Sequence, residues 1–365
     1  MQLDIYDSIR QLANDWPNSD YPFIRYEFLA ALERHNCTSD DTGWAPHHFA
    51  ITTPQGKSVA PAYIKTHSFG EYVFDQPWAQ YYQAHGYQYY PKLLLAIPFT
   101  PVNGPRAIGA NQTELLQAID QYLVDQRNVL SSHLLFAESS QRSLMQTHAV
   151  KRQDVQYHWF NNEYQHFDAY LEQLKSRKRK QIKASKRKIA DAGVTIKRYR
   201  GEQLNEEKLA LFYHCYHITY LKRGRMGYLN RGFFAELFET MADQLMLTVA
   251  YQHGAPIACA LFFQDSNNLY GRYWGATTFV PELHFEVCYQ QGIEYCIEQG
   301  LQHFDPGTQG EHKLLRGFTP VITESLHWLP DDPLLPEVKR WVDQMNAQAH
   351  QWYEEAQLYL PYKQS

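Results

Sequence analysis

The sequence predicts an α/β protein with two domains in tandem, each built on a mixed, mostly antiparallel sheet flanked by helices. The chain has 365 residues, which is enough for two domains of ordinary size. Its 44% hydrophobic and 20% charged residues are typical of globular proteins. Both halves also show the same order of elements: helix, hairpin, aromatic strand, helix and strand. We therefore expect an N-terminal domain over 1–155 and a C-terminal domain over 156–365.

The second half is assigned from its hydrophobic periodicity and its turn residues. Alternation predicts strands, and apolar residues at helical spacing predict helices, with Asn205 and Gly300 as a cap and a stop. The expected elements are a strand at 194–200, helices at 205–223 and 231–243, strands at 245–251, 256–263 and 268–275, a helix at 283–299 and a strand at 301–305. The predicted order is β-α-α-β-β-β-α-β.

The first half shows a shorter version of this plan. A hairpin is expected across the turn Pro54–Lys57, where polar residues join two alternating runs. The expected elements are a helix at 22–36, strands at 48–53, 58–65 and 71–75, a helix at 76–86, a buried strand at 90–99, and further strands at 133–138 and 156–161.

Composition excludes several classes of protein. The net charge of −5 argues against a generally basic nucleic-acid binder. The segment 175–188 nevertheless holds nine Lys and Arg and no acid, leaving 25 basic against 39 acidic residues elsewhere. No run is long and apolar enough for a membrane span, and the N-terminal segment does not resemble a signal peptide. Five scattered cysteines without a CxxC pair argue against a disulfide scaffold and favour the cytoplasm.

With this element order, the sequence resembles the FemAB-like family of predicted N-acyltransferases, which have the GNAT fold and are related to the peptidoglycan-branching aminoacyl transferases. The matching segments are 28–33, 43–48, 63–79, 89–106, 156–159, 176–194, 269–275, 283–295 and 309–318. The resemblance implies tandem GNAT-like domains, an aminoacyl-tRNA as donor and an amine on a cell-wall precursor as acceptor. The family name rests largely on fold, so the reaction is implied less specifically than the fold.

The donor is left open by the junction between the last hairpin strand and the next helix. GNAT enzymes that use acyl-CoA bind its pyrophosphate there on an Arg/Gln-x-x-Gly-x-Gly/Ala turn, whose N–H groups face the anion. In this chain the junction reads GATTFVPELHFE over 275–286, with a single glycine and two bulky residues, Phe279 and Pro281. A standard CoA pocket is therefore not expected, and acyl-CoA would need an atypical one.

The basic segment is expected to form a helix over 176–192, with Ser176 as N-cap and Gly193 just beyond its end. Clustered cations of this kind can bind RNA phosphates or the pyrophosphate of a nucleotide-linked precursor, and they can also form a solvated face paired with acids. The candidate anion-binding residues are Arg177, Lys178, Arg179, Lys180, Lys183, Lys186 and Arg187. Possible partners are thus a precursor amine and a tRNA.

A glycine-rich turn, Gly307–Gly310, follows the strand at 301–305 and leads into Glu311 and His312. Strand ends in α/β sheets open into binding crevices. Acyl transfer to an amine needs a base and donors for the developing oxyanion. Glu311 and His312 are the candidate catalytic bases, while Lys313, Arg316 or backbone N–H groups of the turn would stabilise the oxyanion. The alternative is a polar loop with a helix cap.

Further substrate-binding candidates lie at the preceding helix and strand, namely Arg272, Tyr273, His284 and Glu286. A cleft arginine needs an anionic partner, and either Glu286 or a substrate carboxylate would serve. A metal site needs about three converging ligands. His284, Glu311 and His312 would have to converge for this, and nothing in the sequence requires a metal.

A second polar constellation lies in the first half, with Lys65, His67, Glu71, Asp75, Trp78, Tyr90 and Lys92 as substrate-binding candidates. In a strand at 71–75, Glu71 and Asp75 would share one face and Tyr72 and Phe74 the other. Two explanations stay open. The acids pair structurally with Lys65 and Lys92, or they bind a cationic amine beside Trp78.

Two functions are consistent with these features. The leading hypothesis is an N-acyltransferase acting by direct attack of an amine, with aminoacyl-tRNA or acyl-CoA as co-substrate and no further cofactor. The alternative is a non-catalytic module that binds RNA or an anionic precursor through the basic segment. The sequence has no GxSxG, P-loop, GxGxxG or HExxH motif, which argues against serine hydrolase, nucleotide-binding and zinc-protease chemistry.

Overall fold

The computed structural model describes residues 2–73, 75–125, 129–145, 149–308 and 310–363. The chain divides into two compact units. Unit 1 comprises residues 1–155 and 322–352, and unit 2 comprises residues 156–321 and 353–365. The first change of unit falls at the boundary expected from the sequence. The sequence-based division into 1–155 and 156–365 did not include the return of the chain to unit 1 at residue 322.

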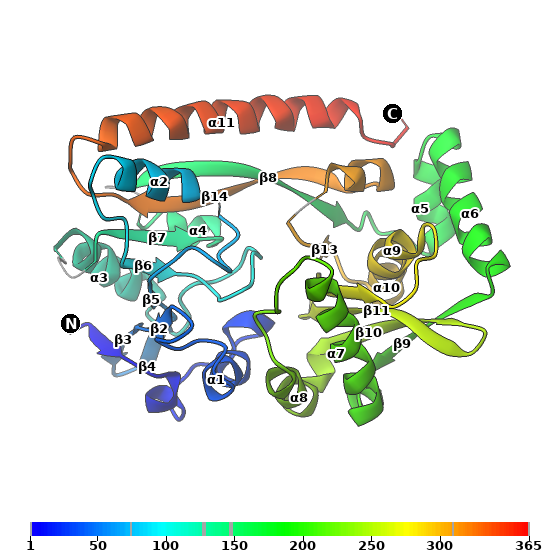
Figure 1. Cartoon of the computed structure of the whole chain (residues 1–365), viewed down its shortest axis with the longest axis horizontal. Coiled ribbons are helices and arrows are strands. Elements are labelled where there is room, and N and C mark those ends of the chain that lie inside the picture. Colours follow the sequence, from blue (N-terminus) through cyan, green and yellow to red (C-terminus); the bar gives the residue numbers. More distant parts are fainter. Residues whose placement is uncertain (1, 74, 126–128, 146–148, 309, 364–365) are drawn as a thin grey trace. The chain divides into compact units, whose positions relative to one another are not determined.

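Unit 2 has the predicted β-α-α-β-β-β-α-β order, and its strands follow the order β8-β13-β12-β11-β10-β9 in the sheet (Figure 1). Its strands are β8 (Val150–Phe160, which begins in unit 1), β9 (Val194–Arg200), β10 (Leu245–Gln252), β11 (Ala255–Gln264), β12 (Asn268–Ala276) and β13 (His303–Asp305). Its helices are α5 (Phe167–Gln173), α6 (Ser176–Asp191), α7 (Glu206–Leu221), α8 (Arg231–Thr240), α9 (Leu283–Phe285) and α10 (Gln291–Gln299). The pairs β8–β13, β9–β10, β10–β11 and β11–β12 are antiparallel, and β12–β13 is parallel.

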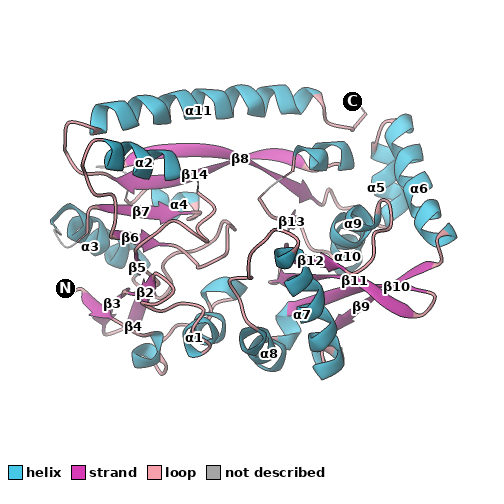
Figure 2. Cartoon of the chain, in the orientation of Figure 1, coloured by secondary structure: helices cyan, strands magenta, loops and turns pink. Residues whose placement is uncertain are grey.

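Unit 1 also holds a mixed sheet, in the order β2-β5-β6-β7-β14, and a separate sheet β1-β3-β4 (Figure 2). Its strands are β1 (Asp4–Tyr6), β2 (Trp44–Pro46), β3 (His48–Thr53), β4 (Gly56–Ala60), β5 (Tyr63–Lys65), β6 (Lys92–Leu95), β7 (Ser131–Leu135) and β14 (Thr319–Trp328, which begins in unit 2). Its helices are α1 (Tyr26–Arg34), α2 (Gln76–Ala84), α3 (Gln112–Asp125), α4 (Ser139–Arg142) and α11 (Leu335–Leu358, which ends in unit 2). The β6–β7 pair is parallel. The predicted fold class, tandem α/β units on mostly antiparallel sheets, is confirmed.

Three sequence-based assignments are wrong in detail. The described part of 71–75 is not a strand, because Tyr72 has a left-handed φ of 61° that no strand accommodates. Phe74 lies outside the described residues. The third strand of unit 1 is instead β5. The strand expected at 90–99 is shorter in the structure, where β6 covers only Lys92–Leu95. Ser176 is the first residue of α6 rather than its N-cap, which is Lys175.

The helix after β12 contains a short π-helical segment, Glu286–Gln290, between α9 and α10. Glu282, directly before α9, has a φ of 68°, which an L-residue with a side chain adopts only at some energetic cost. Segments of π-helix are rare and often occur at functional sites. This local irregularity positions several of the side chains considered below.

Candidate functional site

The glycine turn after β13 is held by a buried lysine. The Gly307 N–H donates to Asp305 Oδ1 at 2.8 Å, and the Lys313 ammonium donates to the Gly307 carbonyl. Lys313 is only 1% exposed, and burial lowers its pKa to about 8 despite the attraction of Asp305. Gln309 lies outside the described residues. These contacts make Lys313 an anchor of the turn, in addition to being a candidate oxyanion donor.

His312 lies at the surface beside this turn, on the 3-10 helix Glu311–Arg316. Its Nε2 lies 3.0 Å from the Tyr289 hydroxyl. Burial of part of the ring, and then the charges of Arg316 and Lys313, lower the pKa of His312 below 6.5, so the imidazole is neutral near pH 7. A neutral, accessible imidazole can accept a proton. Glu311 is also exposed, and its carboxylate makes no hydrogen bond with the residues that the structure describes.

The structure brings His284 next to His312, although the two residues belong to different helices. Their ring centroids lie 6.3 Å apart, and His284 also packs edge-on against Trp274 and Tyr289. Burial lowers the pKa of His284 to about 4, so this ring is neutral as well. The guanidinium carbon of Arg272 lies 5.6 Å from the ring centroid of Tyr273, which packs among aromatic side chains of α7 and α8.

Glu286 lies on a different side of this helix, where it meets the basic helix α6. It is 5% exposed, its Oε1 lies 3.6 Å from Lys186 Nζ, and it accepts a hydrogen bond from Gln291. Burial raises the pKa of Glu286. Lys186 also pairs with Glu294, and Lys183 pairs with Asp168 at 2.8 Å.

Lys183 and Lys186 are each paired with an acid of their own unit, as expected if α6 presents a solvated face. Figure 1 shows α6 beside α5, which carries Asp168. The other predicted anion-binding residues differ in exposure. Arg177, Lys180 and Arg187 are exposed, whereas Lys178 and Arg179 are half-buried. Anion binding by α6 stays a prediction and would fall mainly to its first two turns.

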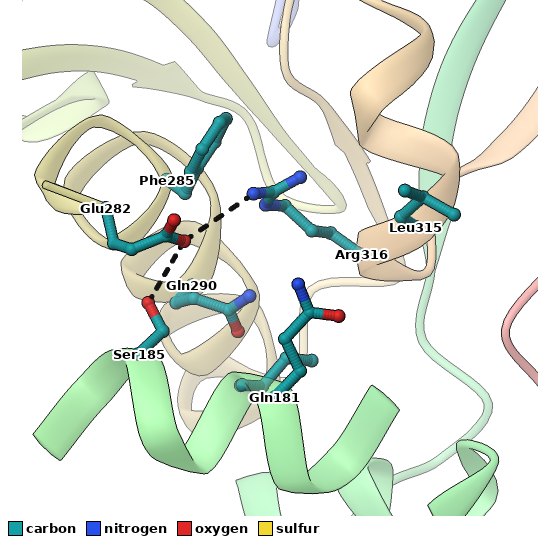
Figure 3. Close-up of a pocket in the computed structure, with 8 residues that line it drawn as sticks. Gln181, Ser185, Glu282, Phe285, Gln290, Leu315 and Arg316 are labelled. Atoms are coloured by element: carbon teal, nitrogen blue, oxygen red, sulfur yellow. Dashed lines mark hydrogen bonds and ion pairs between the residues drawn. The ribbon is translucent and has the colours of Figure 1, made fainter. Parts of the chain in front are cut away.

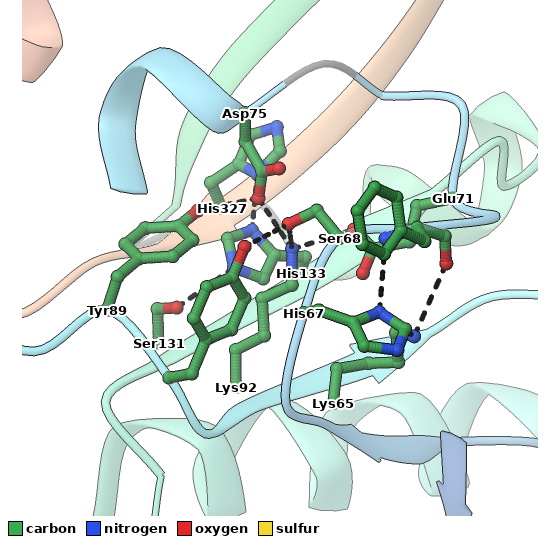
Figure 4. A network of polar contacts seen from close by, with 12 residues as sticks. Lys65, His67, Ser68, Glu71, Asp75, Tyr89, Lys92, Ser131, His133 and His327 are labelled. Atoms are coloured by element: carbon green, nitrogen blue, oxygen red, sulfur yellow. Dashed lines mark hydrogen bonds and ion pairs between the residues drawn. The ribbon is translucent and has the colours of Figure 1, made fainter. Parts of the chain in front are cut away.

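The constellation predicted in unit 1 comes together as a buried polar network around Lys92 (Figure 4). The Lys92 ammonium donates to Glu71 at 2.7 Å, to Asp75 at 2.5 Å and to Ser68 at 2.8 Å. The Tyr89 hydroxyl donates to Asp75 at 2.7 Å. Burial raises the pKa of Glu71 to about 7, while Lys92 holds the pKa of Asp75 well below its usual range against the effect of burial.

Lys65 lies near this network but has weaker polar partners. Its ammonium sits 3.7 Å from the ring centroid of Trp44 and 3.5 Å from His67 Nδ1. Burial lowers the pKa of Lys65 to about 7. Trp78 is 2% exposed and packs on His327, and Tyr90 contacts Ser68 through its hydroxyl. Structural pairing of the acids is thus seen for Lys92, whereas Lys65 forms no ion pair with the acids among the described residues, and an acceptor pocket here stays a prediction.

The titration of Lys65 has a measurable consequence for stability. The unfolded chain binds a proton at Lys65 up to about pH 10.5, whereas the folded chain releases it near pH 7. Stability should therefore rise with pH across this interval, by up to about 1.4 kcal/mol per pH unit. We expect Lys65→Met to remove this contribution to the slope, measured by urea unfolding from pH 7 to 10. The exposed Lys180→Met is the control, and an unchanged slope in Lys65→Met would contradict the assignment.

A pair of buried histidines in the same network was missed from the sequence. Nδ1 of His133 on β7 and Nδ1 of His327 on β14 lie 2.6 Å apart, so one ring donates to the other. Each Nε2 lies 2.9 Å from a serine two residues earlier, Ser131 and Ser325. The repeated Ser-x-His pattern was the available signal, because residues i and i+2 share a strand face.

Among the described residues, no three His, Cys, Asp or Glu side chains are placed to hold a metal ion together. Within the same ranges, every helix is too short or too polar to cross a membrane.

Comparisons with known proteins show the family and the fold of the chain. The FemAB-like family model, described as peptidoglycan biosynthesis/recognition, matches residues 6–364. No curated protein matches the sequence. Similar solved structures include L-PGS from Bacillus licheniformis, with a TM-score of 0.52, 12% identity, and coverage of 88% of this chain and 96% of that chain. FemX is similar with a TM-score of 0.53, 12% identity, and coverage of 93% and 100%. At these identities the two structures show a shared fold.

Proposed function

Because the chain belongs to the FemAB-like family of peptidoglycan biosynthesis and recognition proteins, we propose that it is an N-acyltransferase that moves an acyl or aminoacyl group to an amine of a cell-wall precursor. The observation that carries the proposal is the neutral, accessible imidazole of His312. This ring lies beside a glycine turn at the carboxyl end of β13 and is held by the Tyr289 hydroxyl. Acyl transfer to an amine requires a base and hydrogen-bond donors for the oxyanion, and a base next to backbone N–H groups supplies both.

The reaction follows from this arrangement in one addition and one elimination. With His312 Nε2–H donating to the Tyr289 oxygen, Nδ1 carries the lone pair that accepts a proton from the attacking amine. The amine nitrogen forms a bond to the carbonyl carbon of the donor ester, and N–H groups of the turn or Arg316 stabilise the oxyanion. The carbon–oxygen ester bond then breaks, and the leaving oxygen takes the proton from the imidazolium. No covalent enzyme intermediate is needed.

The proposed donor is an aminoacyl-tRNA. The exposed cations at the start of α6 offer contacts to phosphates. The junction between β12 and α9 lacks the Arg/Gln-x-x-Gly-x-Gly/Ala turn whose N–H groups would bind a CoA pyrophosphate. Acyl-CoA would therefore bind by other contacts, and a binding module without catalysis is the remaining alternative.

A transfer assay tests the proposed function directly. The full chain is incubated with a pool of charged tRNAs and a nucleotide-linked peptide precursor, and the precursor is examined by mass spectrometry. We expect a mass increase of one aminoacyl residue, lost in His312→Ala. Acetyl-CoA in place of the charged tRNA is the second arm, and product in that arm alone would reassign the donor. No product in either arm, with tight tRNA binding retained, would support the binding module instead.

The contribution of α6 can be measured by tRNA binding across a salt series. Arg177→Gln combined with Lys180→Gln removes two exposed cations from one face of the helix. We expect the slope of log affinity against log salt to fall by about one for each phosphate that a removed cation had neutralised. The matched control is Lys339→Gln with Arg340→Gln on α11, which removes the same charge from exposed positions. Equal slopes in both variants would show that α6 is a solvated face.

A further inference from the structure

A cavity of about 130 Å³ lies in unit 2 between α6, the helix after β12 and the 3-10 helix Glu311–Arg316 (Figure 3). It is lined by Gln181, Ile182, Ser185, Glu282, Phe285, Gln290, Leu315 and Arg316. A cavity needs only about 10–15 Å³ of such volume to hold one water. This one therefore has room for a small organic molecule.

One buried acceptor in this cavity has no partner. Gln290 is 4% exposed, and its Oε1 makes no hydrogen bond with the residues that the structure describes. An unpaired buried acceptor destabilises the folded state, and nearly all such groups in folded proteins are paired. Gln290 occupies the last position of the π-helical segment and lines the cavity. Neighbouring atoms cover this oxygen as it is placed, and a half-turn of the side-chain amide would exchange it with Nε2 and let it accept a hydrogen bond from a ligand.

Two opposite charges in the cavity are only loosely paired. Arg316 Nη2 lies 3.7 Å from Glu282 Oε2, which is longer than a hydrogen bond. The Ser185 hydroxyl donates to the same carboxylate oxygen at 3.3 Å, and the guanidinium carbon of Arg316 sits 3.3 Å from the ring centroid of Phe285. A ligand carrying both charges would improve the pairing of each group.

We propose that this cavity binds a small zwitterion, an α-amino acid with free ammonium and carboxylate groups. The ligand carboxylate lies against Arg316, and its ammonium lies against Glu282 and donates to the Gln290 oxygen once that amide has turned by half a rotation. Phe285, Leu315 and Ile182 form the apolar wall for a short side chain. A peptide carboxyl terminus would bring a carboxylate next to Glu282 without an ammonium to offset the repulsion, so the charge pattern favours the free amino acid.

This site shares Arg316 with the proposed reaction, but ligand binding in it can be measured independently of that reaction. The Arg316 Nη1 group donates to the His312 carbonyl at 2.9 Å, and the ring of Phe285, which lines the cavity, lies 5.4 Å from the His312 ring. An amino acid bound here would therefore lie near His312, the candidate base, without exchanging a proton with its ring. Binding can be measured without any acyl donor or acceptor.

The test is calorimetric titration of the full chain with individual free amino acids up to about 10 mM, which suffices to measure a dissociation constant of about 1 mM. We expect at least one amino acid with a short side chain to bind. Its N-acetyl and carboxamide derivatives should each bind at least about tenfold more weakly, because each lacks one charge. An acetylated dipeptide that ends in the same residue tests whether the cavity binds a peptide carboxyl terminus instead of a free amino acid.

Variants localise the binding to this cavity. Glu282→Gln and Gln290→Leu should each weaken it at least about fivefold. Glu298→Gln, which removes an acid paired with Arg198 elsewhere in unit 2, should leave it unchanged. Circular dichroism establishes that the variants fold. The proposal is overturned if no amino acid binds, if the dipeptide binds more tightly than the free amino acid, or if Glu282→Gln binds as the unaltered chain does.

Discussion

Lys92→Met is expected to lower the free energy of unfolding of unit 1 by about 3–5 kcal/mol. The Lys92 ammonium is fully buried between Glu71 and Asp75, which are themselves 5% and 2% exposed. Removing the cation leaves two carboxylates in an environment that cannot solvate them. Methionine fills a similar volume, so the loss reports the charge rather than a cavity. Urea unfolding at pH 7 measures it.

The loss should shrink at acidic pH. The pKa of Glu71 is about 7 even with Lys92 present, and without the cation the pKa values of both acids rise. A carboxyl with a raised folded pKa contributes stability at low pH that is lost as pH increases through that pKa. In the variant the folded pKa of Asp75 is no longer held low by Lys92, so Asp75 can take up a proton as pH falls. The cost of Lys92→Met should therefore be smaller at pH 5 than at pH 7.

A surface pair provides the control for this experiment. Lys57 Nζ lies 2.8 Å from Asp15, whose side chain is 49% exposed. Lys57→Met should cost less than about 1 kcal/mol, because water replaces the missing partner. If Lys92→Met costs no more than this control, or costs the same at pH 5 and pH 7, the network is accessible to solvent and the explanation fails.

The strands of unit 2 could be predicted because each satisfies a local rule. Strand β9 alternates, the hairpin turns between β10, β11 and β12 are polar, and Gly300 ends α10 in the left-handed conformation that glycine permits. The segment 71–75 alternates equally well, yet Glu71 and Asp75 converge on Lys92 through an irregular backbone. The ion pairs with Lys92 determine the backbone of this segment more strongly than the local alternation does. The position of Lys92 in space cannot be predicted from the residues of the segment alone.

The candidate sites show the same division. The glycine turn, His312 and the unit 1 acids were selected as candidates from residue type and spacing. The π-helical segment was not, because its extra residue per turn has no signature in the sequence, and Gln290 was therefore not considered. Pairing of Glu286 with Lys186 was missed for a related reason, since α6 and the helix after β12 lie about a hundred residues apart.

His312→Ala is expected to reduce kcat for aminoacyl transfer by roughly 100- to 10,000-fold, the usual contribution of a positioned base. The same variant should lose the acid limb of the pH profile of kcat/KM. That limb should lie below pH 6.5, because burial, Arg316 and Lys313 lower the pKa of His312. Activity of the unaltered chain thus increases as pH rises through the pKa of His312 and then levels off.

Two companion variants separate a base from a structural residue. Tyr289→Phe removes one neutral hydrogen bond to the ring, worth about 0.5–1.5 kcal/mol, so kcat should fall only about tenfold at most while the acid limb persists. His350→Ala changes an exposed imidazole bound to Gln153 and should leave kcat unaltered. If His312→Ala retains both its rate and its acid limb while Glu311→Gln loses them, the base is Glu311, and the imidazole serves only to pack the aromatic cluster around Tyr289.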